Sequence, residues 1–203
     1  MRVFICGGAG AGKSAFAEGL AQKLGGSLVY VATMPVVSDE DKAKVERHHR
    51  LRAGKGFTTI ERPGALSDLP DNGETMLIEC LSTHVANLIF NPGNAQADVA
   101  QNADCLHPGC PAAVTDTDSG KNADHWIKTL KTELAPLLAR KGNTIFVSLE
   151  ITSDGTTYSP ETEAYKSVLT AVNRHLVQNA DAAFEVVCGI PVKIKGELPC
   201  LKV

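Results

Sequence analysis

The chain has 203 residues, of which 43% are hydrophobic and 21% charged, so it can bury one substantial core and we expect a single α/β domain. Its net charge of -3 and its aromatic content of 5% argue against nucleic acid as a partner, because nucleic acids bind basic surfaces and stacking side chains. No apolar stretch approaches the roughly 20 residues of a membrane-spanning helix, and we expect a cytoplasmic protein without a membrane span.

The first predicted elements are a strand over 2–6 and a helix over 13–24, and the loop between them fits the phosphate-binding pattern G-x-x-x-x-G-K-[ST] at every defined position. The glycines let backbone N–H groups point at phosphate oxygens, Lys13 supplies a cation, and Ser14 supplies a hydroxyl for a bound Mg²⁺. The loop consists of Gly7, Gly8, Ala9, Gly10, Ala11, Gly12, Lys13 and Ser14. A chance glycine-rich turn is the weaker interpretation, because both flanking elements fit. The dinucleotide-binding pattern needs a third glycine at another offset and does not fit.

The middle of the chain continues the alternation of strands and helices. We expect strand 27–32, an exposed helix over 39–52, strands at 57–61 and 75–81, and a helix that ends near residue 90. From 91 to 123 the composition changes to Pro, Gly, Asn, Asp and Ala without periodicity, which predicts an insertion or mobile loop. A helix over 124–140 and a strand over 144–149 follow.

The last part of the chain begins with a loop and a long amphipathic helix that starts at Pro160. A strand over 183–188 is then followed by a hairpin of 191–195 and 198–203, with its turn at Gly196. The whole pattern predicts a P-loop nucleotide-binding α/β domain over 1–203. We expect a mostly parallel central sheet, flanking helices and a C-terminal β-hairpin.

Two carboxylates are expected at the edge of the sheet where the phosphate loop lies. Glu79 stands near the end of its strand and Glu150 follows the strand 144–149, and ligands of open parallel sheets bind outside the carboxyl ends of the strands. Glu79 is the better candidate to bind Mg²⁺ with Ser14 and so to offset charge on the phosphates. For each carboxylate, a solvated charge at a strand end is the alternative interpretation.

The helix over 39–52 carries two adjacent histidines, His48 and His49. Val45, His48 and Arg52 share one face of this helix, which puts an imidazole beside a guanidinium. A neutral imidazole is a nucleophile at pH 7 and a guanidinium holds phosphate oxygens in a fork, so the pair suits attack on a phosphoryl group. From spacing alone, a solvated basic helix face explains the same residues.

The predicted insertion contains Cys105, His107 and Cys110, which are residue types that bind Zn²⁺. Their spacing matches no familiar zinc pattern, and a polar loop can hold two cysteines by chance. We therefore expect ordinary loop residues here.

Taken together, these segments resemble the bifunctional adenosylcobinamide kinase/adenosylcobinamide-phosphate guanylyltransferase family of cobalamin biosynthesis. The resemblance covers nearly the whole chain except 91–123 and rests on the order and spacing of short segments. Those segments are Gly7–Ser14, Tyr30–Thr33, Asp39-Glu40, Lys44–His48 with Arg52, Ile78–Leu81, Val85–Leu88, Glu150, Pro160-Glu161, Val172-Asn173 and Gly189–Lys195. Two segments depart from the family pattern. The family has Asn-Glu-Val-Gly where this chain has Leu149–Thr152, and Arg-x-Phe-Arg-Asp where it has Tyr165–Val168.

The resemblance implies a P-loop fold, assembly as a homotrimer and two reactions on a corrinoid substrate. In the first, a nucleoside triphosphate, either GTP or ATP, phosphorylates the aminopropanol hydroxyl of adenosylcobinamide. In the second, GMP passes from GTP to that phosphate through a guanylyl-histidine intermediate. Two other interpretations stay open, namely a P-loop kinase or guanylyltransferase with a single activity and a nucleotide-dependent regulatory module.

The resemblance also implies roles for individual residues. His48 matches the family's nucleophile, and His49 is the fallback. Lys13, Glu79 and Mg²⁺ on Ser14 would offset charge on the phosphates during transfer. Arg52 and Glu150 join the phosphate loop as expected nucleotide-binding residues.

Overall fold

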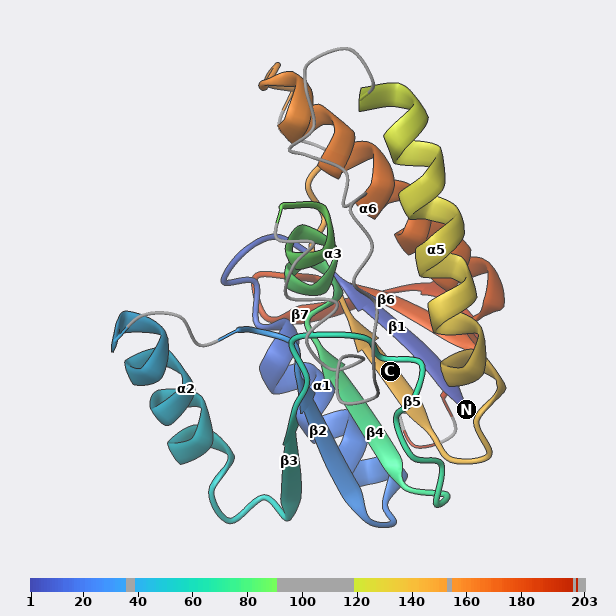
Figure 1. The fold of residues 1–203 in the computed structure, drawn as a ribbon. Helices are drawn as coiled ribbons and strands as arrows, with labels where there is room; N and C mark the ends of the chain where they lie inside the picture. The colour runs from blue at the N-terminus through green and yellow to red at the C-terminus, as the bar shows by residue number, and fades with distance from the viewer. Residues whose placement is uncertain (36–38, 91–118, 153–154, 199, 201–203) are drawn as a thin grey trace, which may run out of the picture.

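The computed structural model describes residues 1–35, 39–90, 119–152, 155–198 and 200. Its centre is a seven-stranded sheet in the order β3-β2-β4-β5-β1-β6-β7 (Figure 1). The strands are β1 (Arg2–Cys6), β2 (Leu28–Ala32), β3 (Phe57–Glu61), β4 (Thr75–Glu79), β5 (Thr144–Val147), β6 (Ala182–Val187) and β7 (Ile190–Lys195). All described pairings are parallel except that of β6 with β7. The expected mostly parallel sheet with a C-terminal hairpin is confirmed.

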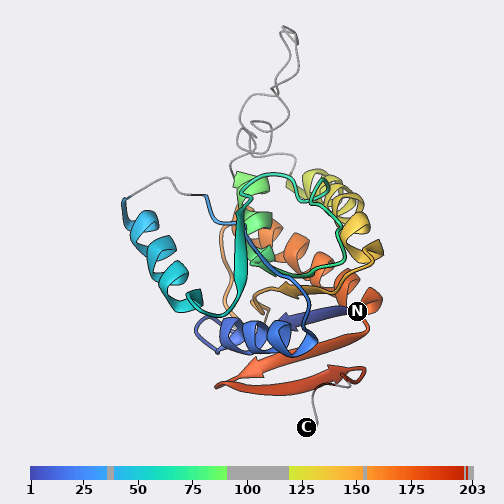
Figure 2. The same ribbon diagram turned by 90° about the horizontal axis from the view of Figure 1, so that it is seen from below.

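Helices cover both faces of this sheet (Figure 2). They are α1 (Lys13–Leu24), α2 (Asp39–Arg52), α3 (Leu81–Phe90), α5 (Ser119–Ala139) and α6 (Pro160–Asn179). The side chains of β1 alternate between two cores: Ile5 packs on the face that α1 covers, and Phe4 packs on the face that α3, α5 and α6 cover. Helix α2 stands beside the β3 edge, outside both layers (Figures 1 and 2).

Three predicted boundaries differ from the structure by two residues or more. The strand expected over 144–149 ends at Val147. The strand expected over 75–81 ends at Glu79, and Leu81 already begins α3. Helix α5 begins at Ser119 rather than at 124, inside the interval assigned to the insertion. Residues 91–118, which hold most of that predicted insertion, lie outside the described residues.

The C-terminal hairpin lies one strand earlier than the sequence indicated. Its strands are β6 and β7, with Val187 opposite Ile190. Most of the strand expected over 198–203 lies outside the described residues, so the turn expected at Gly196 stays a prediction. The turn between β6 and β7 consists of Cys188 and Gly189, whose φ angles of 50° and 83° place both in the left-handed region. Two such residues form the short hairpin turns that match the twist of the strands. Because Cys-Gly is not one of the usual turn pairs, the apolar run up to 188 looked like an uninterrupted strand.

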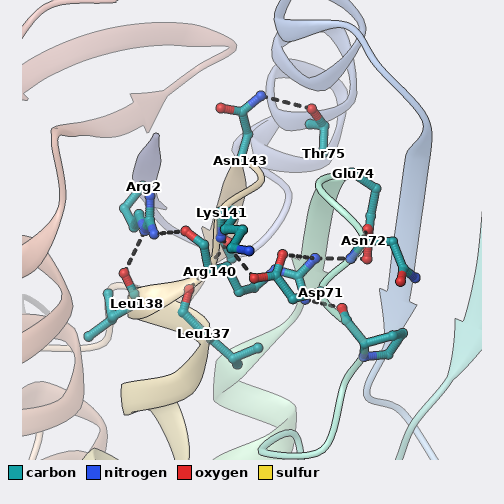
Figure 3. A network of polar contacts seen from close by, with 12 residues as sticks. Arg2, Asp71, Asn72, Glu74, Thr75, Leu137, Leu138, Arg140, Lys141 and Asn143 are labelled. Carbon is teal, nitrogen blue, oxygen red and sulfur yellow. Dashed lines mark hydrogen bonds and ion pairs between the residues drawn. The ribbon is translucent and has the colours of Figure 1, made fainter.

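A polar network fixes the amino ends of the strands, at the edge of the sheet opposite the phosphate loop (Figure 3). Arg140 is 3% exposed and donates hydrogen bonds to Glu74 Oε1 at 2.7 Å and to the carbonyl oxygen of Pro70. The guanidinium of Arg2 donates to the carbonyl oxygens of Leu138 and Arg140. Burial acts to raise the pKa of Glu74, but hydrogen bonds from backbone N–H groups and Arg140 hold it below its usual value.

The Arg140→Met variant is expected to lower the free energy of unfolding by about 3 to 5 kcal/mol, because it leaves the buried Glu74 carboxylate without its cation. Equilibrium denaturation measures this change. Lys141→Ala removes an exposed neighbouring cation and is expected to change stability little. Adding Glu74→Gln to Arg140→Met should restore part of the loss. Equal small effects for Arg140→Met and Lys141→Ala would mean that the network does not stabilise the fold.

Candidate active site

The phosphate loop connects β1 to α1 at the carboxyl end of the sheet (Figure 1). Its crest, Gly8–Gly10, is exposed. Gly7 and Gly12 have φ angles of 147° and 96°, which side chains disfavour. A Cβ atom on Gly7 would lie 2.4 Å from the carbonyl oxygen of Val186, and one on Gly12 would lie 3.2 Å from the Cα of Gly189. These two glycines therefore let the loop pass against the β6–β7 hairpin.

Backbone hydrogen bonds hold the loop from two sides. Gly189 N donates to the carbonyl oxygen of Ala11 at 2.8 Å, and Glu150 N donates to that of Gly7 at 3.1 Å. Glu150 thus lies at the expected edge, and its backbone supports the loop. Its carboxylate accepts hydrogen bonds from the backbone N and the hydroxyl of Thr152.

The side chain of Lys13 lies inside the phosphate loop. Its side chain is almost buried, and Nζ donates to the carbonyl oxygen of Gly8 at 2.6 Å. Burial lowers the pKa of Lys13 below its usual value, and the negative charge of nearby Glu79 opposes that shift. An anion in the loop would stabilise the protonated ammonium further.

Ser14 and Glu79 meet although they are 65 residues apart: the Ser14 hydroxyl donates to Glu79 Oε1. Leu77 packs on the face of β4 that α1 covers, and Glu79, two residues later, lies on that same face. Ser14 lies in the first turn of α1, where its hydroxyl reaches Glu79. A hydroxyl and a carboxylate oxygen are ligands that suit Mg²⁺, so the predicted pair fits this ion. Within the described ranges, no group of three or more His, Cys, Asp or Glu residues forms a metal site.

Arg52, at the end of α2, is buried and lies flat on Tyr30, with its guanidinium carbon 3.6 Å from the ring centre. Its Nε and Nη1 atoms are buried and have no hydrogen-bond partner among the residues that the structure describes. Buried donors without acceptors cost free energy, so this guanidinium is suited to receive oxygen atoms of a ligand. Burial first, and then the charge and hydrogen bond of Glu79, raise the pKa of Tyr30, which keeps its hydroxyl protonated.

Arg52 lines a cavity of about 190 Å³ that also reaches Glu79. The other lining residues are Tyr30, Ala32, Met34, Val45, Cys80 and Thr83. Since Glu79 contacts Ser14, the cavity lies directly beside the phosphate loop. A ligand whose phosphates occupy the loop can therefore place another part in the cavity, near the free donors of Arg52.

Several residues of this cavity had no predicted site role, above all Tyr30. The position of Tyr30 follows from the register of the strands, which only the structure shows. Tyr30 pairs with Leu77 in the sheet and Ala32 pairs with Glu79, so strand alternation puts Tyr30 on the face of Glu79. Cys80 was also missed. Its sulfur lies 2.9 Å from the Ser82 hydroxyl at the start of α3.

Position 48 belongs to α2 and lies one turn before Arg52. Helical spacing puts it on the same face as Val45 and Arg52, which both line the cavity. The side chains of His48 and His49 lie outside the described part of the structure. Cys105, His107 and Cys110 also fall outside the described residues.

No helix in the described segments is long and apolar enough to cross a membrane.

Comparison with known proteins gives a match along the chain. A family model for cobinamide kinase / cobinamide phosphate guanyltransferase matches residues 3–194. The bifunctional adenosylcobalamin biosynthesis protein CobU of Escherichia coli (strain K12) is 28% identical over 210 residues, which cover 96% of this chain and 100% of that protein. The protein of the same name from Salmonella typhimurium (strain LT2) is 27% identical, with 96% and 100% covered. The bifunctional protein CobP of Pseudomonas aeruginosa is 34% identical over 94 residues, which cover 44% of this chain and 54% of that protein.

Proposed function

Because the chain belongs to the cobinamide kinase / cobinamide phosphate guanyltransferase family, we propose that it catalyses both reactions of that name. It phosphorylates adenosylcobinamide with a nucleoside triphosphate and then transfers GMP from GTP to adenosylcobinamide phosphate. The contact of Ser14 with Glu79 beside the phosphate loop is the observation that carries this proposal. It joins the hydroxyl, the carboxylate and the anion-binding backbone that phosphoryl transfer uses.

We propose that the triphosphate of the nucleotide, GTP or ATP, lies in the loop from Gly7 to Ser14. Lys13 would contact the phosphate oxygens, and Ser14 and Glu79 would hold Mg²⁺. When bound, Mg²⁺ offsets negative charge on the phosphates. The buried N–H groups of Arg52 would then bind oxygen atoms of GTP in the adjacent cavity, which supports the expected role of Arg52 as a nucleotide-binding residue.

We propose His48 as the nucleophile of the second reaction, because position 48 lies on the cavity-facing side of α2 between Val45 and Arg52. Its neutral imidazole nitrogen forms a bond to the α-phosphorus of GTP, and pyrophosphate leaves with the electrons of the broken P–O bond. A phosphate oxygen of adenosylcobinamide phosphate then attacks the same phosphorus. The P–N bond breaks, and the imidazole is restored.

Incubation with GTP labelled at the α-phosphate tests the proposal. The protein is expected to acquire a label that is labile in acid and stable in alkali, as a phosphoramidate is, and to release it to adenosylcobinamide phosphate. Transfer of γ-phosphate to adenosylcobinamide without protein labelling would instead indicate a kinase alone. Bound nucleotide without either transfer would indicate a regulatory module.

Replacing Arg52 by methionine is expected to raise the KM for GTP by about 10- to 100-fold, since hydrogen bonds from a charged donor contribute about 1.5 to 3 kcal/mol. Methionine keeps much of the apolar contact with Tyr30. Arg50→Met is the matched control, because Arg50 is exposed on the same helix. Steady-state kinetics of GMP transfer measure both variants. A KM for GTP that stays the same in Arg52→Met would exclude Arg52 from the nucleotide site.

We also propose that the protein acts in the cytoplasm as a homotrimer. Exposed apolar side chains on the β6–β7 hairpin support association of copies, because such a patch is typically covered by a partner. The residues are Val187, Ile190, Val192 and Ile194, which are 46 to 66% exposed in the single chain. Sedimentation equilibrium measures the mass of the assembly directly.

A further inference from the structure

A second groove lies along α6, outside the nucleotide cavity. It has a volume of about 370 Å³. It is lined by Thr152, Glu163, Lys166, Ser167, Thr170, Ala171 and Arg174. All of these residues except Thr152 belong to α6, and Thr152 comes from the loop after β5. The proposed placement of GTP uses none of them.

The groove carries two cations and one carboxylate. The side chain of Lys166 is only 14% exposed, and its Nζ lies 3.8 Å from Glu163 Oε1 and 4.7 Å from the ring centre of Tyr158. These contacts hold the ammonium against the protein rather than in open solvent. Arg174 supplies a guanidinium at the other end, and the hydroxyl of Ser167 lies between them along the helix. An excess of positive charge together with the Ser167 hydroxyl suits a phosphate group.

The groove is connected to the phosphate loop through the end of β5. Thr152 N donates to Glu150 Oε1 at 2.7 Å, and Glu150 N donates to the Gly7 carbonyl oxygen at 3.1 Å. On the helix side, Asn173 precedes Arg174 and accepts a hydrogen bond from the Ser148 hydroxyl at 2.7 Å. The same short segment, 148–152, therefore supports the loop and supplies Thr152 to the lining of the groove.

We propose that this groove binds the phosphate-bearing arm of the corrinoid acceptor, which is a phosphate monoester. This inference rests on the proposed function. If one phosphate loop serves both reactions, the phosphate added in the first must leave the loop before the triphosphate of GTP enters for the second. A cationic groove beside the loop binds the monoester during this exchange. The acceptor then stays on the protein between the two reactions.

The test compares the Lys166→Gln/Arg174→Gln variant with the unchanged protein by titration calorimetry. Glutamine keeps much of each side chain and removes its charge. The variant is expected to bind adenosylcobinamide phosphate at least about 10-fold more weakly, since two charge-assisted hydrogen bonds are lost. Its affinity for adenosylcobinamide, which lacks the phosphate, and its labelling by α-labelled GTP should both change less than twofold. Glu163→Gln should act in the opposite direction and tighten binding of the phosphorylated acceptor.

Lys128→Gln/Lys131→Gln is the matched control, because these exposed lysines of α5 line a separate surface hollow. This control variant should change neither the affinity for adenosylcobinamide phosphate nor the affinity for adenosylcobinamide. An equal loss for both corrinoids in the α6 variant would overturn the proposal, and so would unchanged binding of the phosphorylated one. If the α6 variant lost labelling by GTP but still bound the phosphorylated acceptor, the groove would be assigned to a nucleotide phosphate. That result would also overturn the proposal. If the unchanged protein binds the phosphorylated acceptor but GTP does not label it, the proposed function fails while the groove is still tested by the charge variants.

Discussion

The Lys13→Ala variant is expected to lose both transfer reactions, with kcat/KM lower by at least about 10³-fold, because preorganised charge in a site shielded from water stabilises the transition state strongly. The structure gives this expectation its physical basis. The ammonium is almost buried inside the loop, where it donates a hydrogen bond to the carbonyl oxygen of Gly8 and lies near the negative charge of Glu79. Alanine removes the one cation that the loop itself supplies to the phosphates.

Steady-state kinetics of both reactions and calorimetric titration with GTP measure this effect. Lys23→Ala is the control, since Lys23 is an exposed lysine in the last turn of the same helix. It is expected to retain full activity. Thermal unfolding establishes that Lys13→Ala is folded. A folded Lys13→Ala variant with the full rate would remove the phosphate loop from both reactions.

The His48→Ala variant is expected to acquire no label from α-labelled GTP and to lose GMP transfer entirely, because alanine has no nucleophilic atom to form the P–N bond. The affinity for GTP should change by no more than about twofold, since the loop and Arg52 provide the binding contacts. Phosphorylation of adenosylcobinamide should continue, because γ-phosphate transfer needs no protein nucleophile. Labelling after acid and alkali treatment, with a separate kinase assay, measures each part.

His49→Ala is the matched control for the nucleophile. It changes the adjacent imidazole on a different face of α2 and should keep the label. The opposite result, a label that persists in His48→Ala and disappears in His49→Ala, would assign the nucleophile to His49. A label that persists in both variants would place the covalent step on a residue outside this helix.

Together the two variants separate the activities. Lys13→Ala removes a group that we propose both reactions share, whereas His48→Ala removes a group that we propose only GMP transfer uses. A chain with GMP transfer alone would lose its activity in both variants, and a chain with kinase activity alone would lose it only in Lys13→Ala. This comparison therefore tests the bifunctional assignment itself.

Much of the fold could be predicted because its elements are locally encoded. The apolar runs at 2–6, 75–79 and 144–147 formed buried parallel strands, since strands covered on both faces need apolar side chains at consecutive positions. Pro160 marked the start of α6, which begins there. The hairpin of β6 with β7 was not predicted, because its turn, Cys188-Gly189, lacks a familiar turn signal, and its left-handed backbone is visible only in the structure.

The sequence by itself determined the phosphate loop, because its glycines, Lys13 and Ser14 are neighbours whose backbone geometry follows from residue type. It also placed Glu79 near the end of a strand at the same edge of the sheet. Only the tertiary structure decided that Ser14 contacts Glu79, that Arg52 is buried on Tyr30 with unpaired donors, and that Lys166 and Arg174 share a groove. These contacts depend on strand register and helix packing between segments far apart in the chain, which local residue patterns do not encode.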